Sequence, residues 1–338
     1  MEWEAEPNAT GLYEKMGARR AEYMGTRESD SRDRRVMRPI ELGPNQFPRF
    51  YRGGPRIAAF RGLPQSAENT PEDWIASTTH AYGEENGPSR LPDGTALADA
   101  MAAAPDEFFE PEHVARFGPH PEVLIKLLDA GERLPVHFHP DAGFARAHLG
   151  SNHGKTEAWI IVEADAGAAV WVGFAREVEE DELARWVDEQ DVDAMLGAMN
   201  RIGVAPDDEI FVPAGVAHAI GEGILLLELQ EPSDLSLLLE GDRFLDLPRE
   251  LALTAVQRYG VPVERGLPPD SERFFRAEWV EAGATLEPAF SVLVVTKGEG
   301  ALDEVDVRRG STILVPYAAG ACELRGDVRA IRCRPPNA

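Results

Sequence analysis

Strand-sized apolar segments recur along this chain, and glycine, proline and acidic residues separate one segment from the next. They continue almost to the end of the chain, at 123–128, 159–162, 168–172, 209–213, 224–229, 291–295 and 310–316. Each segment is shorter than an ordinary helix and has the length of a strand. Many short strands with turn residues between them are typical of a β-sandwich or a β-barrel. The sequence therefore predicts a mainly β protein.

Two regions instead carry helical signals. Residues 95–117 contain alanine-rich and acidic stretches that predict helix. Farther along, apolar residues such as Leu183, Trp186 and Met195 recur at helical spacing among many carboxylates, which predicts an amphipathic helical pair between strands. Glycine and proline break the segment 39–81 into pieces that predict strands and turns.

These patterns divide the chain into an arm, two β-rich units and a connection. The charged segment 1–38 is expected to form an N-terminal arm. The first unit is expected to span 39–240 and to contain the helical insertion at about 174–203. A connection with a short helix, 241–270, leads to a second unit at 271–338, which has no histidine. A site that depends on histidine is therefore expected only in the first unit.

The chain also carries a large negative charge. Its 338 residues include 34 lysines and arginines against 59 aspartates and glutamates, a formal net charge of −25. Such a surface repels phosphate backbones and anionic membranes, so we expect neither nucleic acid nor a membrane as a partner. No apolar stretch has the length of a membrane span, and the start lacks a signal-peptide pattern. With two cysteines expected to be unpaired, Cys322 and Cys333, we predict a cytoplasmic location.

Three of the eight histidines lie in a pattern that predicts a metal site. His137 and His139 are two residues apart at a strand end, so both imidazoles point to the same side. Glu157 begins the next apolar strand, and His218 follows the turn at 213–215. Three neutral imidazoles and one carboxylate suit a divalent metal, with Zn²⁺ as our first expectation and Fe, Mn, Co or Ni as alternatives. The other five histidines are expected to lie outside the site.

Together with the sequence segments that flank them, these residues resemble the type I phosphomannose isomerases (mannose-6-phosphate isomerases) of the cupin superfamily. The resemblance runs from about residue 40 to the end and rests on the segments 53–56, 72–74, 124–130, 139–141, 154–159, 213–219 and 227–234. It implies two cupin-like β-barrels (jelly rolls), only the first of which holds a metal. It also implies that His137, His139, Glu157 and His218 are the metal ligands, although the family usually has glutamine at the position of His137.

The resemblance implies an activity as well, the isomerisation of mannose 6-phosphate to fructose 6-phosphate through a cis-enediolate. The metal would act as a Lewis acid. Lys155 matches the family's active-site lysine and lies two residues before Glu157, so it is a candidate phosphate contact or acid–base group. Glu228, a carboxylate within an apolar strand, is a second catalytic candidate, with a structural salt bridge as the alternative. The expected partner is a small sugar or sugar phosphate, and a homodimer is left open.

One departure from the family concerns the phosphate. Where the family has an active-site arginine after its Ser-Asp pair, this chain has Leu238. Arg243 is nearby, but the sequence does not show whether it can take that place. This loss, together with the charge and the three-histidine ligand set, favours an alternative in which a metal-binding cupin acts on an unphosphorylated sugar or another small carbonyl compound, or binds sugars without turnover. A purely structural protein without metal is a third hypothesis.

Overall fold

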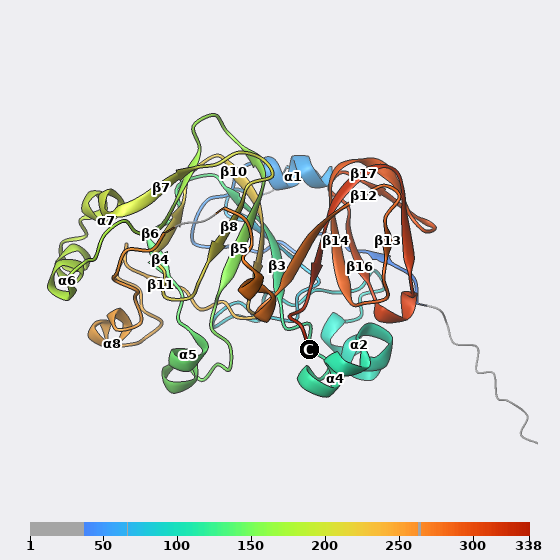
Figure 1. Ribbon diagram of the computed structural model, residues 1–338, viewed down its shortest axis with the longest axis horizontal. Coiled ribbons are helices and arrows are strands. Elements are labelled where there is room, and N and C mark those ends of the chain that lie inside the picture. Colours follow the sequence, from blue (N-terminus) through green and yellow to red (C-terminus); the bar gives the residue numbers. More distant parts are fainter. Residues whose placement is uncertain (1–36, 66, 263–264) are drawn as a thin grey trace, which may run out of the picture. The chain divides into compact units, whose positions relative to one another are not determined.

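The structure of this protein is a computed structural model that describes residues 37–65, 67–262 and 265–338 (Figure 1). Its strands form antiparallel sheets, two with five strands and one with seven. Short helices connect the strands. The prediction of a mainly β protein is therefore confirmed. The predicted arm at 1–38 lies outside the described residues, apart from Met37 and Arg38.

The first five-stranded sheet has the order β2-β3-β10-β5-β8. Its strands are β2 (Glu72–Ile75), β3 (Leu124–Ala130), β10 (Ile224–Gln230), β5 (Glu157–Ala164) and β8 (Glu209–Val212). Apart from β2, each of them overlaps one of the apolar segments that predicted a strand. The sheet brings together strands that are distant in sequence, so that Lys126 on β3 lies opposite Glu228 on β10.

Both faces of this sheet are covered, and its side chains alternate between them. On one face Ile125 and Leu227 pack in a cluster with residues of the seven-stranded sheet. On the other face Leu226 and Trp159 pack in a cluster with residues of the second five-stranded sheet. A strand that is buried on both faces reads as a continuous apolar run. The unbroken runs in the sequence therefore mark a central sheet between two others.

The second five-stranded sheet has the order β11-β4-β9-β6-β7. Its strands are β11 (Leu237–Leu238), β4 (His137–Phe138), β9 (His218–Ile220), β6 (Ala169–Phe174) and β7 (Met199–Gly203). Helices α6 (Glu180–Glu189) and α7 (Val192–Ala198) lie between β6 and β7, where the helical pair was predicted. Their apolar faces, including Leu183 and Trp186, pack in a cluster with Phe138 and Leu237 of this sheet.

The seven-stranded sheet is built mainly from the end of the chain. Its strands have the order β1-β16-β14-β17-β12, and in addition β15 pairs with β14 and β13 pairs with β17. The strands are β1 (Ile40–Glu41), β16 (Thr312–Val315), β14 (Ser291–Leu302), β17 (Cys322–Arg334), β12 (Arg276–Glu281), β15 (Val305–Arg308) and β13 (Thr285–Leu286). Its second face closes over a separate apolar cluster that includes Leu293, Val307 and Leu324. Strand β1 comes from the start of the described chain, so residues 40–41 belong to this sheet.

The remaining helices are short. They are α1 (Arg56–Arg61), α2 (Leu97–Ala103), α3 (Pro105–Phe108), α4 (Pro111–Phe117), α5 (Ala142–His148), α8 (Arg249–Leu253) and the 3₁₀ helices η1 (Pro269–Arg273) and η2 (Tyr317–Ala319). Helix α1 lies where strands and turns were predicted. Pro55 precedes it and Gly62, at φ 67°, ends it, so the same proline and glycine that suggested turns are its caps.

As far as the described residues go, no sheet closes on itself. The expectation of two barrels is therefore not confirmed by the strand pairing, which shows open antiparallel sheets packed face to face. No helix in the described ranges is long and apolar enough to cross a membrane.

Candidate functional site

A cavity opens beside the two five-stranded sheets, and the predicted site residues gather there. Its walls include His137, Lys155, Glu157 and Glu228. Lys155 lies two residues before β5 and Glu157 begins that strand. Glu228 comes from the middle of β10, and His137 from β4 in the opposite sheet. The site is therefore assembled from both sheets.

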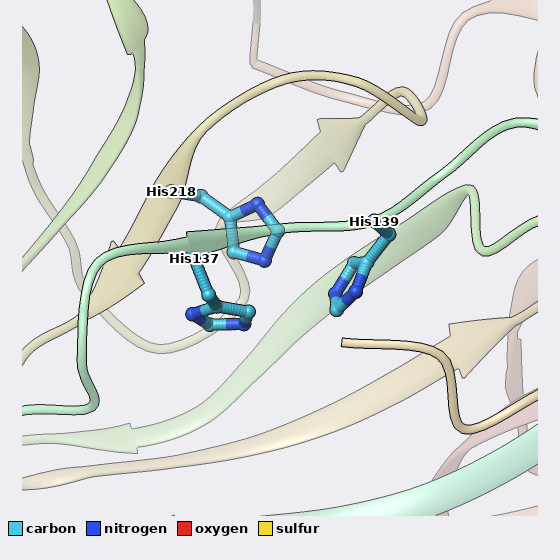
Figure 2. A group of neighbouring side chains, drawn as sticks. All are labelled: His137, His139 and His218. Carbon is cyan, nitrogen blue, oxygen red and sulfur yellow. The ribbon is translucent and has the colours of Figure 1, made fainter. Parts of the chain in front are cut away.

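Three imidazoles meet at one place beside this cavity (Figure 2). His137 and His218 are direct partners in the pairing of β4 with β9, and His139 follows two residues after His137. The ring centroids of His139 and His218 lie 5.1 and 4.1 Å from that of His137. One ring nitrogen of each histidine lies within 4.8 Å of those of the other two. The structure thus brings together the three histidines that the sequence singled out.

Each of these imidazoles is oriented by a hydrogen bond from Nδ1 to a backbone carbonyl. The pairs are His137 with Pro135 (2.7 Å), His139 with Leu235 (2.8 Å) and His218 with Val216 (2.8 Å). Because a carbonyl oxygen only accepts, Nδ1 carries the proton in each ring, and Nε2 of the neutral ring keeps a lone pair. This arrangement is the usual one for histidines that bind a metal through Nε2.

Glu157 completes the cluster. Its carboxylate oxygens lie 3.0 Å from Nε2 of His139 and 3.4 Å from Nε2 of His218. Trp159 donates its indole N–H to Oε1 of Glu157 over 3.0 Å, which fixes the carboxylate. Within the described part of the chain, Nε2 of His218 and Oε2 of Glu157 are buried without a hydrogen-bond partner. Nε2 of His218 is thus a buried acceptor left unsatisfied, which is costly, and Oε2 of Glu157 has only the neighbouring Lys155 ammonium to balance its charge. A cation between them would satisfy both atoms.

The protonation states also suit a metal. Burial, followed by the neighbouring Lys155, lowers the pKa of His139 to about 3. Burial likewise lowers the pKa values of His137 and His218, so all three rings are neutral near pH 7. Burial alone would raise the pKa of Glu157, but Lys155 and His139 hold it well below its usual range. The donor set is therefore three neutral imidazoles and one carboxylate, which fits a divalent first-row metal.

Buried charges extend from this cluster across the first sheet. The Lys155 ammonium lies 2.9 Å from Nε2 of His139, 3.1 Å from Oε2 of Glu157 and 3.7 Å from Oε1 of Glu228. Glu228 in turn lies 3.2 Å from the ammonium of Lys126, its cross-strand partner. The predicted catalytic pair, Lys155 and Glu228, therefore faces the same cavity as the histidines, in direct mutual contact.

The pKa of the Glu228 carboxyl group is shifted in the opposite direction to that of Glu157. Burial, and next the negative charge of Glu157, raise the pKa of Glu228 to about 7, although Lys126 and Lys155 oppose the rise. One carboxylate of the site is thus held ionised, while the other can exchange a proton near neutral pH. Such a separation is a feature of acid–base sites.

We expect the metal-free Glu228→Gln variant to gain stability relative to the wild type as the pH rises from about 5 to 7. The folded protein keeps a proton on Glu228 up to pH 7, whereas the unfolded chain releases it near 4.5. Glu228 should therefore contribute a loss of stability on the order of 3 kcal/mol as the pH rises from about 5 to 7, opposed by the gain from the three buried histidines, and the variant should lack this contribution. Urea unfolding at a series of pH values measures the difference. Glu222→Gln, in the exposed turn before β10, is the control, and equal slopes for wild type and Glu228→Gln would contradict the assignment.

The cavity also contains charged residues that the sequence interpretation left without a role. Arg49 lies 3.5 Å from Glu72 and 3.0 Å from Asp234, and Lys126 lies 3.7 Å from Glu72. Tyr51 makes a hydrogen bond to Glu72. A lysine within the apolar segment 123–128 was a signal for Lys126, since a buried strand tolerates a charge only where it has a partner. Arg49 gave no such signal, because it lies in an irregular segment before α1.

Comparisons with known proteins agree with this geometry. A mannose-6-phosphate isomerase from Streptococcus mutans is 29% identical over 309 residues, which cover 82% of this chain and 93% of that protein. The mannose-6-phosphate isomerase ManA of Bacillus subtilis is 28% identical over 305 residues, with the same coverage of 82% and 93%. The chain is a relative of the mannose-6-phosphate isomerases. No family model matches the chain.

A solved structure of a related protein extends the likeness to the fold. The crystal structure of the mannose 6-phosphate isomerase from Bacillus subtilis superposes with a TM-score of 0.72 at 22% identity, over 88% of this chain and 100% of that one. At this identity the likeness concerns the fold, which is mainly β with several antiparallel sheets. The fold agrees with the family resemblance found in the sequence, which the two relatives above confirm.

Proposed function

We propose that this protein is a metal-dependent aldose–ketose isomerase that converts mannose 6-phosphate to fructose 6-phosphate. The observation that carries the proposal is the convergence of three imidazoles and the Glu157 carboxylate beside a cavity that also holds Lys155 and Glu228. The relatives named mannose-6-phosphate isomerase, which this chain matches over most of their length, supply the reaction. Their names do not favour the alternative of an unphosphorylated substrate or of sugar binding without turnover.

The metal would be held by His137, His139, Glu157 and His218, and Zn²⁺ is our first choice for it. The support is the tautomer of each ring and the buried Nε2 of His218, which has no hydrogen-bond partner among the described residues. When bound, the metal supplies a Lewis acid that polarises the sugar carbonyl. The Lys155 ammonium contacts His139, Glu157 and Glu228. With a metal on the first two, Lys155 would keep its contact with Glu228 and gain one with the substrate.

Lys155 and Glu228 would carry the proton chemistry. Isomerisation requires that a proton leaves C2 of the aldose and arrives at C1, while protons move between the two oxygens. A carboxylate with a pKa of about 7 is suited to take up and return a proton at neutral pH, and Glu228 has this property. Lys155, 3.7 Å from Glu228, would donate to the oxygens and stabilise negative charge on them.

We infer two cupin-like units for the architecture that positions this site. The metal-binding unit would span about 39–240 with its helical insertion at 174–203, and the unit without histidine would span 271–338 after the connection at 241–270. Separate apolar clusters between the two five-stranded sheets and within the seven-stranded sheet support this division. The pairing of β1 with β16 means that residues 40–41 would serve the second unit.

The proposed function is tested by a coupled assay that detects fructose 6-phosphate formed from mannose 6-phosphate by the metal-loaded protein. We expect turnover that a chelator abolishes and that added Zn²⁺ restores. Turnover of mannose in the absence of any turnover of mannose 6-phosphate would replace the proposal by the alternative. If the fully metal-loaded protein turned over neither sugar, the result would support the alternative in which the protein binds sugars without turnover.

The indole of Trp159 should strengthen metal binding, because it donates to Oε1 of Glu157. Trp159→Phe is expected to weaken metal affinity about 10- to 100-fold. Competition with a chromogenic chelator measures this. Trp74→Phe is a matched control, since Trp74 is equally buried and donates to Glu72, also two residues before it, over 2.6 Å. Equal losses of metal affinity in both variants would mean that the effect comes from packing alone.

A further inference from the structure

The cations inside the cavity are already engaged. Lys126 and Lys155 both contact the carboxylate of Glu228. Lys126 also contacts that of Glu72, and Lys155 also contacts that of Glu157. Arg49 contacts Glu72 and Asp234, as described above. A sugar phosphate brings further negative charge into a site where four carboxylates face three side-chain cations, and its phosphate end would lie away from the proposed metal. It therefore needs a positive group that is not already paired.

Arg243 belongs to a row of cross-strand partners that also contains two of the three clustered histidines. In the second five-stranded sheet, His218 pairs with His137, His137 pairs with Leu238, and Leu238 forms a bridge with Arg243. The bridge has both backbone hydrogen bonds, from Leu238 N to Arg243 O at 2.7 Å and from Arg243 N to Leu238 O at 3.2 Å. Directly paired residues point to the same face of a sheet.

The position of this row relative to the cavity sets what Arg243 can reach. Because His137 and Leu238 line the cavity, their neighbour Arg243 projects on the cavity side of the sheet. It lies two strand spacings from His137, roughly 10 Å. A hexose phosphate carries its phosphate at the end opposite to its carbonyl. A carbonyl beside the histidines would therefore direct the phosphate toward Arg243.

The loop that carries Arg243 is fixed by the helical insertion. The Gln190 side chain, at the end of α6, donates to Leu239 O over 3.2 Å and accepts from Gly241 N over 2.6 Å. With the bridge to Leu238, these bonds hold the loop on both sides of its turn. The backbone of Arg243 is therefore held in place, and only its side chain needs to adjust.

The guanidinium of Arg243 is available, in contrast to those inside the cavity. Two acidic residues of the same loop are engaged elsewhere, Glu240 with Arg133 at 2.7 Å and Asp242 with Arg249 at 3.7 Å. Among the described residues, Arg243 makes no ion pair. Its guanidinium lies 5.6 Å from the ring centroid of Phe50, an exposed aromatic residue on the cavity wall.

We infer that Arg243 binds the phosphate group of the substrate, in place of a cation at position 238. This inference rests on the proposed function, since it assigns the phosphate end of the same substrate. A planar guanidinium can donate two parallel hydrogen bonds to a phosphate, and the Phe50 ring keeps it at the mouth of the cavity until the substrate arrives. Arg243 is thus a residue that determines specificity for phosphorylated over plain sugars.

The test compares Arg243→Ala and Arg243→Lys with the wild type in the coupled assay. We expect Arg243→Ala to raise KM for mannose 6-phosphate about 10- to 100-fold with little change in kcat, and Arg243→Lys to fall between the two. The inhibition constant of inorganic phosphate should rise in parallel. An unchanged KM and an unchanged inhibition constant in Arg243→Ala would overturn the inference.

Arg273→Ala is the matched control. Arg273 is also exposed, lies 5.9 Å from the ring centroid of Phe274 and belongs to η1, outside the cavity walls. It should leave KM unchanged. If the wild type proves inactive on mannose 6-phosphate, the proposed function fails, and calorimetric titration with inorganic phosphate still tests Arg243. Phosphate binding that Arg243→Ala abolishes would support the subsite, and absent or unaffected binding would overturn it.

Discussion

Replacing His139 by alanine is expected to abolish metal retention and activity together. The variant loses one of the three clustered imidazoles. Of the three, His139 has the Nε2 atom that lies 3.0 Å from Glu157. A Lewis acid lowers the activation barrier by several kcal/mol, so its loss should reduce kcat/KM by roughly 10³-fold or more. Metal content after dialysis, measured by elemental analysis, should drop from about one ion per chain to a small fraction.

The fold should survive this substitution, because the apolar clusters on both faces of the central sheet do not include His139. The lost hydrogen bond to Leu235 O should cost about 1–3 kcal/mol, which thermal unfolding can follow. Glu157→Gln, which keeps the shape of the side chain, is a second variant with the same expected loss of metal. His148→Ala, at the exposed end of α5, is the control. Full metal content in His139→Ala would show that the ligand assignment is wrong.

Replacing Lys155 by alanine should separate the chemistry from metal binding. Its ammonium is placed to move protons beside Glu228, so its loss should lower kcat about 10²- to 10⁴-fold. Metal affinity should stay the same or increase, because Lys155 contacts His139 and Glu157 and so competes with a metal for both. The measurements are kcat in the coupled assay, metal content, and exchange of the C2 proton of mannose 6-phosphate with solvent.

Opposite effects on kcat and on metal affinity distinguish a catalytic role of Lys155 from a structural one. Small primary amines should restore part of the activity of Lys155→Ala, which a merely misfolded variant would not permit. Lys297→Ala, which removes an exposed lysine 3.5 Å from Asp207, is the control and should behave as wild type. A fully metal-loaded Lys155→Ala whose kcat is within tenfold of the wild type would contradict the proposed role.

The local pattern of the sequence was sufficient for most strands of the central sheet. The continuous apolar run 224–229 predicted a buried strand, because the backbone and burial preferences of its residues act within the segment itself. The short helix α1 was missed for the same local reason, since Pro55 and Gly62 are compatible with both a turn and a pair of caps. The two-residue spacing of His137 and His139 placed both imidazoles on one side of the chain without any further knowledge.

The sequence by itself determined most strands of the central sheet, the helical pair and a candidate set of metal ligands, whose role remains a prediction. Only the tertiary structure decided what surrounds that set. Strand pairing between distant segments put Lys126 against Glu228, and it put Arg243 in one row with Leu238 and His137. Such registers depend on non-local contacts, which local propensity does not encode. For that reason the sequence showed that a cation is missing at position 238, and the fold was needed to show where another one lies.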